Sequence, residues 1–232
     1  MCGRYVQTMP AEVLRQLFQT AGAPPNLAPS WNVAPTQAAP VVRRHPETGE
    51  RRLDLLRWGL LPRWSKDPKG ARQPINARAE TVASSPMFHE AFAKRRCLVP
   101  ADAFYEWKVE PGSGKQSMAI APKSGEGMAF AGIWEGCRGE GGEAVRTFAI
   151  VTTDANATMR AVHDRMPVVL APDDWAEWLE GEDPAALLRP APDDLLRFWP
   201  VSKAVNSPRN NGPELLAEHA PAPTEGGGPN PA

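Results

Sequence analysis

Proline is the feature that most restricts how this chain can fold. It occupies 26 of 232 positions, about twice the usual share of roughly 5%. Proline lacks a backbone N–H and interrupts helices and central strands, so these positions predict short elements joined by ordered loops and exclude a helical bundle. Apolar residues make up 42% and charged residues 23%, which is typical of a globular protein rather than a disordered one.

Apolar periodicity predicts a few helices among many short strands. Helices are predicted over 10–22, 85–95 and 173–180, the first with an apolar stripe of Val13, Leu14, Leu17 and Phe18. Strands are predicted over 41–44, 53–58, 97–99, 104–109, 117–121, 128–134, 147–152 and 167–170. This order predicts the α+β class, with a curled sheet that is mixed or mostly antiparallel. We expect one domain over residues 2–217, followed by a disordered Pro/Gly-rich tail over 218–232.

Other general features predict an intracellular protein without cofactors. We expect no membrane span, because no apolar run reaches about 18 residues, and no secretion, because the N-terminus lacks a signal pattern. Cys2, Cys97 and Cys137 cannot all pair, which favours the reducing cytoplasm. No histidines and carboxylates fall at metal-ligand spacing, so no metal is predicted. Nothing in the sequence indicates more than a monomer.

Charge is distributed unevenly along the chain. Residues 1–100 hold 15 Lys and Arg against 7 Asp and Glu, a net charge of +8, whereas residues 101–232 have a net charge of −9. A basic half can recruit a polyanion such as nucleic acid while the whole chain stays near neutral. A solvated surface of mixed charge remains the alternative.

Cys2 is the first candidate for chemistry. Once Met1 is removed, this residue carries an α-amine and a thiol on adjacent carbons, with reference pKa values of about 8 and 8.5. The amine could serve as base for the thiol, as in N-terminal-nucleophile hydrolases. Alternatively, the amine could attack an aldehyde to form an imine, and the thiol could then close a five-membered thiazolidine.

Glu106 and His163 are the candidate proton carriers. Glu106 lies on the predicted strand 104–109, whose alternation places Phe104, Glu106 and Lys108 on one face. A carboxyl group in an apolar setting can act as general acid and base, although a solvent-facing position would also fit the pattern. His163 lies in a polar turn, where an imidazole that titrates near neutral pH suits a proton shuttle or a purely structural role.

Several polar and aromatic residues are candidates for binding. The string 74–81 offers Asn76 to orient a nucleophile, Arg78 to bind phosphate, and Glu80 to hold Arg78 or Arg4. Arg4 itself could bind phosphate or lower the pKa of the Cys2 thiol. Pro62 and Arg63 should hold Trp64 at the surface, where an exposed indole can stack on unpaired bases. Turn, surface and core roles are the alternatives for these residues.

Eight motifs in order give the chain a specific resemblance. They are MCGRY at 1–5, WNVAPT at 31–36, RWGLLPRW at 57–64, INARAET at 75–81, CLVPADAFYEWK at 97–108, TTDAN at 152–156, HDRMPV at 163–168 and VSKAVNSPRNNGPELL at 201–216. The chain resembles the SOS-response-associated peptidase (SRAP) family, whose domain crosslinks itself to abasic sites in single-stranded DNA. The resemblance spans about residues 2–216 and implies an α+β, barrel-like fold around a DNA groove.

The resemblance also implies roles for individual residues. Cys2 would be the nucleophile that forms the thiazolidine with the ring-opened sugar, and Asn76 would hold the adduct. Glu106 and His163 would move protons. Arg4 and Arg78 would grip phosphates, Asn32 and Thr153 would line the pocket, and Trp64 and Trp107 would contact bases.

Two other functions stay open at this point. One is a cysteine peptidase that acts on its own N-terminus, with Cys2 as nucleophile. The other is a non-covalent reader of single-stranded or modified DNA, which would use only the basic half and the tryptophans.

Overall fold

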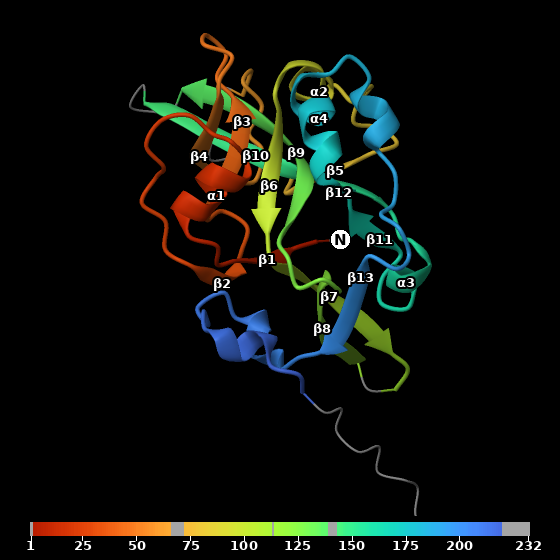
Figure 1. Cartoon of the computed structure of the whole chain (residues 1–232). Coiled ribbons are helices and arrows are strands. Elements are labelled where there is room, and N and C mark those ends of the chain that lie inside the picture. The colour runs from red at the N-terminus through yellow and green to blue at the C-terminus, as the bar shows by residue number, and fades with distance from the viewer. Residues whose placement is uncertain (1, 66–71, 113, 139–142, 220–232) are drawn as a thin grey trace, which may run out of the picture.

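Five strands close into a barrel, which forms the upper part of the molecule in Figure 1. Four neighbouring pairs around the ring are antiparallel, and β4 and β10 are parallel. The ring is formed by β3 (Ala38–Arg44), β4 (Arg51–Trp58), β6 (Arg96–Ala101), β9 (Met128–Arg138) and β10 (Ala144–Asp154). The computed structural model describes residues 2–65, 72–112, 114–138 and 143–219. The predicted α+β class and its curled, mixed sheet are confirmed.

A second sheet lies below the barrel (Figure 1). Its five strands are antiparallel to their neighbours. In spatial order they are β13 (Leu196–Pro200), β8 (Gly114–Pro122), β7 (Ala103–Glu110), β1 (Arg4–Gln7) and β2 (Ser30–Val33). β7 follows barrel strand β6 after the single residue Asp102, whose carboxylate accepts a 2.8 Å hydrogen bond from the Thr8 hydroxyl. The connection fixes the second sheet against the open end of the barrel.

The barrel strands are apolar on both faces because each face is covered. Along β10, Phe148 and Ile150 belong to an interior cluster, whereas Ala149 and Val151 pack outward. The outer face is covered by α1 (Ala11–Leu17), α2 (His89–Lys94) and α4 (Trp175–Glu180). The same interior cluster includes Tyr5 and Phe104, so the core runs without a break from the barrel to the second sheet.

Short elements flank the last residues of β10. β5 (Asn76–Arg78) pairs with it in parallel, and β11 (Arg165–Pro167) pairs with it antiparallel. Thr152 is the register partner of both Arg78 and Pro167. The end of β10 therefore lies between two three-residue strands. The remaining short elements are α3 (Ala157–Arg160), β12 (Val169–Leu170) and 3-10 turns at Pro172–Asp174, Pro184–Leu187, Lys203–Asn206 and Pro213–Leu216.

Some predicted elements are longer than the observed ones. The helix predicted over 10–22 ends at Leu17, because Gln19 takes a left-handed φ of 53° that a helix cannot continue. Only part of its predicted stripe is buried: Leu14 and Phe18 are covered, but Val13 is 46% and Leu17 45% exposed. The helix predicted over 85–95 begins at His89.

Four strands were not predicted, namely β1, β2, β5 and β13, and the strand predicted over 167–170 overlaps β11 only at Pro167. The predicted disordered tail lies outside the described residues from 220 onward. Within the described ranges, the helices are too short or too polar to cross a membrane.

Candidate active site

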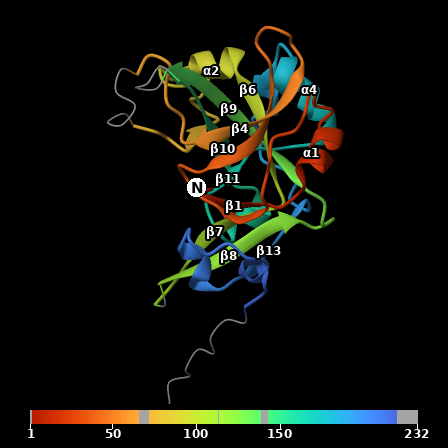
Figure 2. The same cartoon turned by 90° about the vertical axis from the view of Figure 1, so that its left-hand side faces the viewer.

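Cys2 lies where the chain enters β1, at the junction of the two sheets. β1 pairs with β7 so that Arg4 lies opposite Tyr105 and Tyr5 opposite Phe104. Cys2 is 0% exposed and packs in the interior cluster. In both views the N-terminal end of the chain lies beside β11 (Figures 1 and 2). The fold thus brings the start of the chain to the end of β10, although the two are far apart in sequence.

Asn76 is held against Cys2 by a direct hydrogen bond. Its Nδ2 donates to the backbone carbonyl oxygen of Cys2 over 2.9 Å. Asn76 begins β5 and is the register partner of Ile150 on β10, whose side chain faces the interior. Its Oδ1 is buried and has no hydrogen-bond partner among the described residues. One end of the amide therefore binds the Cys2 backbone, and the other is a buried acceptor without a hydrogen-bond donor among the described residues.

Glu106 lies beside the Cys2 thiol. The predicted alternation of β7 is confirmed, because Phe104 packs in the interior cluster with Cys2 whereas Tyr105 packs in a separate cluster on the other face. Glu106 shares the face of Phe104 and is 2% exposed. Burial, and then the negative charge of Glu106, raise the pKa of the Cys2 thiol well above its ordinary value. The thiol is consequently protonated at neutral pH, with a carboxyl group nearby.

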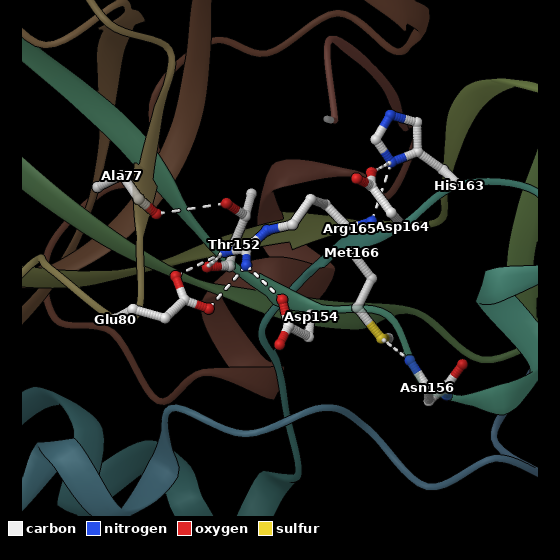
Figure 3. Close-up of polar contacts among 9 residues, drawn as sticks. All are labelled: Ala77, Glu80, Thr152, Asp154, Asn156, His163, Asp164, Arg165 and Met166. Atoms are coloured by element: carbon white, nitrogen blue, oxygen red, sulfur yellow. Dashed lines mark hydrogen bonds and ion pairs between the residues drawn. The ribbon is translucent and has the colours of Figure 1, made fainter.

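His163 follows α3, whose first turn is capped by a motif residue. Asn156 Oδ1 accepts a hydrogen bond from the Met159 backbone N–H at 2.8 Å, and its Nδ2 donates to the carbonyl oxygen of Ala191. His163 Nδ1 lies 2.8 Å from an oxygen of Asp164 and 2.9 Å from the backbone nitrogen of Arg165 (Figure 3). Val162 packs in the same interior cluster as Cys2. The ring is thus oriented by its own turn, beside the cluster that holds Cys2.

The two predicted phosphate ligands differ in exposure. Arg78 ends β5 and is exposed. Arg4 is half-buried, and burial lowers the pKa of its guanidinium. Its Nη1 donates to the Gly3 carbonyl oxygen at 2.9 Å, and its Nε is buried without a hydrogen-bond partner in the described ranges. A bound anion at Arg4 would offset the cost of burying this cation.

The two tryptophans lie in different settings. Trp64 is 63% exposed on the loop after β4, so the predicted surface position is confirmed. Trp107 is half-buried on the outer face of β7, and its indole N–H donates to Asn206 Oδ1 at 2.7 Å. Trp64 can offer a free ring face to a base, whereas one edge of Trp107 is engaged within the protein.

Asn32 is hydrogen-bonded within the protein, and its contact with a ligand stays a prediction. Its side chain is 1% exposed, and Nδ2 donates to the carbonyl oxygens of Val205, Ser207 and Asn210 at 3.0–3.2 Å. These bonds tie β2 to the motif at 201–216. Thr153 on β10 is 5% exposed, which leaves little of its side chain open to a strand of DNA.

Arg165 is a site residue to which the sequence assigned no role. Its guanidinium binds both carboxylate oxygens of Glu80 and one of Asp154, and it donates to the Thr152 carbonyl oxygen (Figure 3). Glu80 was expected to hold Arg78 or Arg4, but its ion pair is with Arg165. In the sequence, the motif HDRMPV at 163–168 contains Arg165 and could have marked it as a candidate.

In the described part of the chain, no cluster of three or more His, Cys, Asp or Glu residues is arranged to hold a metal ion.

Comparison with known proteins identifies the family. Residues 1–208 match the family described as SOS response associated peptidase (SRAP). The chain belongs to the SRAP family. Its resemblance to that family, read from eight short motifs, is therefore confirmed.

Relatives of this SRAP chain include bacterial and vertebrate proteins. It is 39% identical over 226 residues to the "Abasic site processing protein YoqW" of Bacillus subtilis, with 94% of this chain and 100% of the relative covered. Identity to "Abasic site processing protein YoaM" of the same organism is 40% over 223 residues, covering 93% and 97%. "Abasic site processing protein HMCES" of Xenopus tropicalis is 31% identical over 82% of this chain and 66% of its own length.

Solved structures share the fold of this SRAP chain. A protein from Bacteroides thetaiotaomicron superposes with a TM-score of 0.84 at 23% identity, covering 94% of this chain and 100% of its own. A protein from Bordetella bronchiseptica gives a TM-score of 0.76 at 27% identity, covering 87% and 100%. The predicted barrel-like architecture is thus the architecture of these neighbours.

Proposed function

We propose that this chain binds abasic sites in single-stranded DNA and bonds covalently to them through Cys2. Relatives that match almost the whole chain are named abasic site processing proteins. The observation that carries the proposal is the grouping of Cys2, Asn76 and Glu106, which come from three distant parts of the sequence. This grouping serves a nucleophile at residue 2, which requires removal of Met1 to free the α-amine.

The proposed reaction joins one residue to one sugar carbon. The Cys2 amine attacks the C1′ aldehyde of the ring-opened sugar, and loss of one water gives an imine. The thiol sulfur then adds to the imine carbon while the thiol proton is transferred and the nitrogen becomes a secondary amine. The product is a thiazolidine, and the net change is protein plus DNA minus one water. Because both nucleophiles belong to one residue, the second step is intramolecular and has a large effective molarity.

The surroundings of Cys2 suit both steps. A protonated thiol must lose its proton as the carbon–sulfur bond forms, and in this proposal Glu106, whose charge acts on the thiol, accepts it. The same carboxyl group, once protonated, can assist sugar ring opening and the loss of water. Asn76 fixes the Cys2 backbone, and its Oδ1 can accept a hydrogen bond from the adduct. His163 serves as a second proton carrier near the same end of the chain.

Single-stranded DNA is the substrate in this proposal. An abasic nucleotide has no base to unstack, and a single strand presents it without unpairing a duplex. Arg4 and Arg78 would hold the neighbouring phosphates, and the exposed Trp64 would stack on an adjacent base.

Denaturing mass spectrometry tests this function directly. Protein shown to lack Met1 is incubated with a single-stranded oligonucleotide that contains one abasic site. We expect a heat-stable species with the mass of protein plus oligonucleotide minus one water, formed without a reducing agent.

The Cys2→Ser variant is the matched control. It keeps the α-amine but cannot close a thiazolidine, so no stable adduct should form, while non-covalent binding is retained. If Met1-free wild-type protein binds the DNA without forming an adduct, the chain is a reader of the lesion and the covalent proposal fails. Hydrolysis of added peptides without an adduct would instead support a peptidase.

A further inference from the structure

The guanidinium of Arg165 joins three separate segments near the proposed site. Its Nη1 lies 2.7 Å from oxygens of both Glu80 and Asp154, and its Nη2 lies 3.0 Å from the second oxygen of Glu80 (Figure 3). Nη2 also donates to the Thr152 carbonyl oxygen at 2.7 Å. The Arg165 side chain is only 12% exposed. Glu80 binds the guanidinium through both carboxylate oxygens, so the contact is two-pronged, with a largely buried arginine and a partly exposed glutamate.

Of these three partners, Glu80 alone comes from the β5 side. Asp154 and Thr152 lie on β10, which already pairs through its backbone with β11, the strand of Arg165. Glu80 follows β5 by two residues. The Glu80–Arg165 pair therefore spans the end of β10 and links the two short strands on either side of it.

One residue of the proposed site lies on β5, and another lies two residues before β11. Asn76 lies on β5 and donates to the Cys2 carbonyl oxygen, while His163 accepts the backbone N–H of Arg165 at its Nδ1. β5 and β11 have three residues each, so few backbone hydrogen bonds hold either of them. The Glu80–Arg165 ion pair between them restricts how far Asn76 and His163 can move apart.

We propose that Glu80 is a positioning residue that, through Arg165, holds β5 and β11 in place and so keeps Asn76 and His163 in position around Cys2. This role rests on the proposed function for its chemical consequence. The Glu80–Arg165 ion pair forms without DNA, so its effect can be measured both in the absence of DNA and in the crosslinking reaction.

The first readout is alkylation of Cys2 in the absence of DNA. Cys2 and Cys97 are both 0% exposed, so Cys97 serves as an internal reference for general loosening of the fold. We expect Glu80→Gln to increase the rate of Cys2 alkylation by iodoacetamide about three-fold, measured by peptide mass mapping, with Cys97 unchanged. Glu12→Gln breaks another Glu–Arg pair, with Arg15 on α1, and should leave both rates unchanged.

The second readout separates chemistry from binding. Glu80→Gln should lower the crosslinking rate constant at saturating abasic DNA about three-fold. Its affinity for an oligonucleotide containing a tetrahydrofuran analogue, which has no aldehyde, should stay close to that of the wild type.

The outcomes distinguish this role from its alternatives. If the alkylation rates of Cys2 and Cys97 rise together, Glu80 only stabilises the fold. If the alkylation rate of Cys2 does not change, Glu80 does not position this site. Either result overturns the proposal. If wild-type protein forms no adduct, the proposed function fails. A faster alkylation of Cys2 but not of Cys97 in Glu80→Gln would still support the positioning role of the Glu80–Arg165 pair. Equal loss of crosslinking rate and of analogue binding would make Glu80 a binding residue and contradict the proposal.

Discussion

Asn76 Nδ2 and the carbonyl oxygen of Cys2 are 2.9 Å apart, and this hydrogen bond connects a strand beside β10 to the start of the chain. It joins the proposed nucleophile directly to another candidate residue. The bond acts on the backbone of Cys2, so it fixes where the α-amine and the thiol point without engaging either group. Positioning of this kind matters most for a residue that uses two adjacent nucleophiles in succession.

Replacement of Asn76 should therefore slow the reaction more than it weakens binding. Loss of one hydrogen bond in Asn76→Ala corresponds to about a ten-fold lower crosslinking rate at saturating abasic DNA. Single-turnover assays on denaturing gels measure the rate. A variant that reacts at the wild-type rate but binds the analogue poorly would contradict the positioning role.

Glu106→Gln should remove proton transfer while keeping the shape of the side chain. We expect the crosslinking rate to fall about a hundred-fold or more, the usual size of a general acid–base contribution, with little change in melting temperature. Glu110→Gln is the matched control, because Glu110 lies on the same strand but forms a surface pair with Lys108. Equal rates for the two variants would remove Glu106 from the chemistry.

Arg78→Ala should weaken DNA binding in a way that depends on salt. Each phosphate contact to a single strand contributes about 0.7 to the slope of log K against log salt, so the slope should fall by about that amount. Arg15→Ala, on α1, should leave it unchanged. Fluorescence anisotropy between low and moderate salt gives both slopes, and identical slopes for wild type and Arg78→Ala would exclude a phosphate contact.

Asn32→Ala should affect stability rather than DNA recognition. The change removes the amide donor from one buried carbonyl group, that of Val205, and from the partly buried ones of Ser207 and Asn210, which costs about 1–3 kcal/mol of unfolding free energy. Thermal unfolding should shift downward, while the folded fraction should bind DNA as the wild type does. Unchanged stability with a reduced affinity for DNA would instead support the prediction that Asn32 lines the DNA pocket.

The Glu80–Arg165 pair should make stability depend on pH in the acidic range. The hydrogen bonds from Arg165 lower the pKa of Glu80 from its ordinary value. Because the folded pKa is depressed, the stabilisation is complete above the unfolded pKa of about 4.3 and is lost as pH falls through the folded value. Glu80 is 46% exposed, so the effect stays below about 1 kcal/mol. The difference in melting temperature between wild type and Glu80→Gln should shrink as pH is lowered from 6 toward about 3.

That pH series also has a clear contrary outcome. A difference in melting temperature that stays constant down to low pH would mean that the variant acts through packing rather than through charge. A difference that grows on acidification would have the wrong sign for this ion pair.

The sequence determined the fold class, the alternation of β7 and most members of the candidate site. Proline spacing and short apolar runs are local properties, so they predict the short elements and the curled sheet directly. The placement of Phe104 and Glu106 on one face of β7 follows from the period of a strand alone. Cys2, Asn76 and Glu106 were chosen from their chemistry and from ordered motifs, which need no coordinates.

Only the tertiary structure decided which of these residues meet. β1, β5 and β13 are short or lack strict alternation, and they form because neighbouring strands accept their hydrogen bonds. Asn32 and Glu80 have partners more than 80 residues away in sequence, so no local pattern could show that one binds backbone carbonyls and the other Arg165. Sequence carries residue type and periodicity, whereas long-range pairing depends on how the barrel closes and where β10 ends.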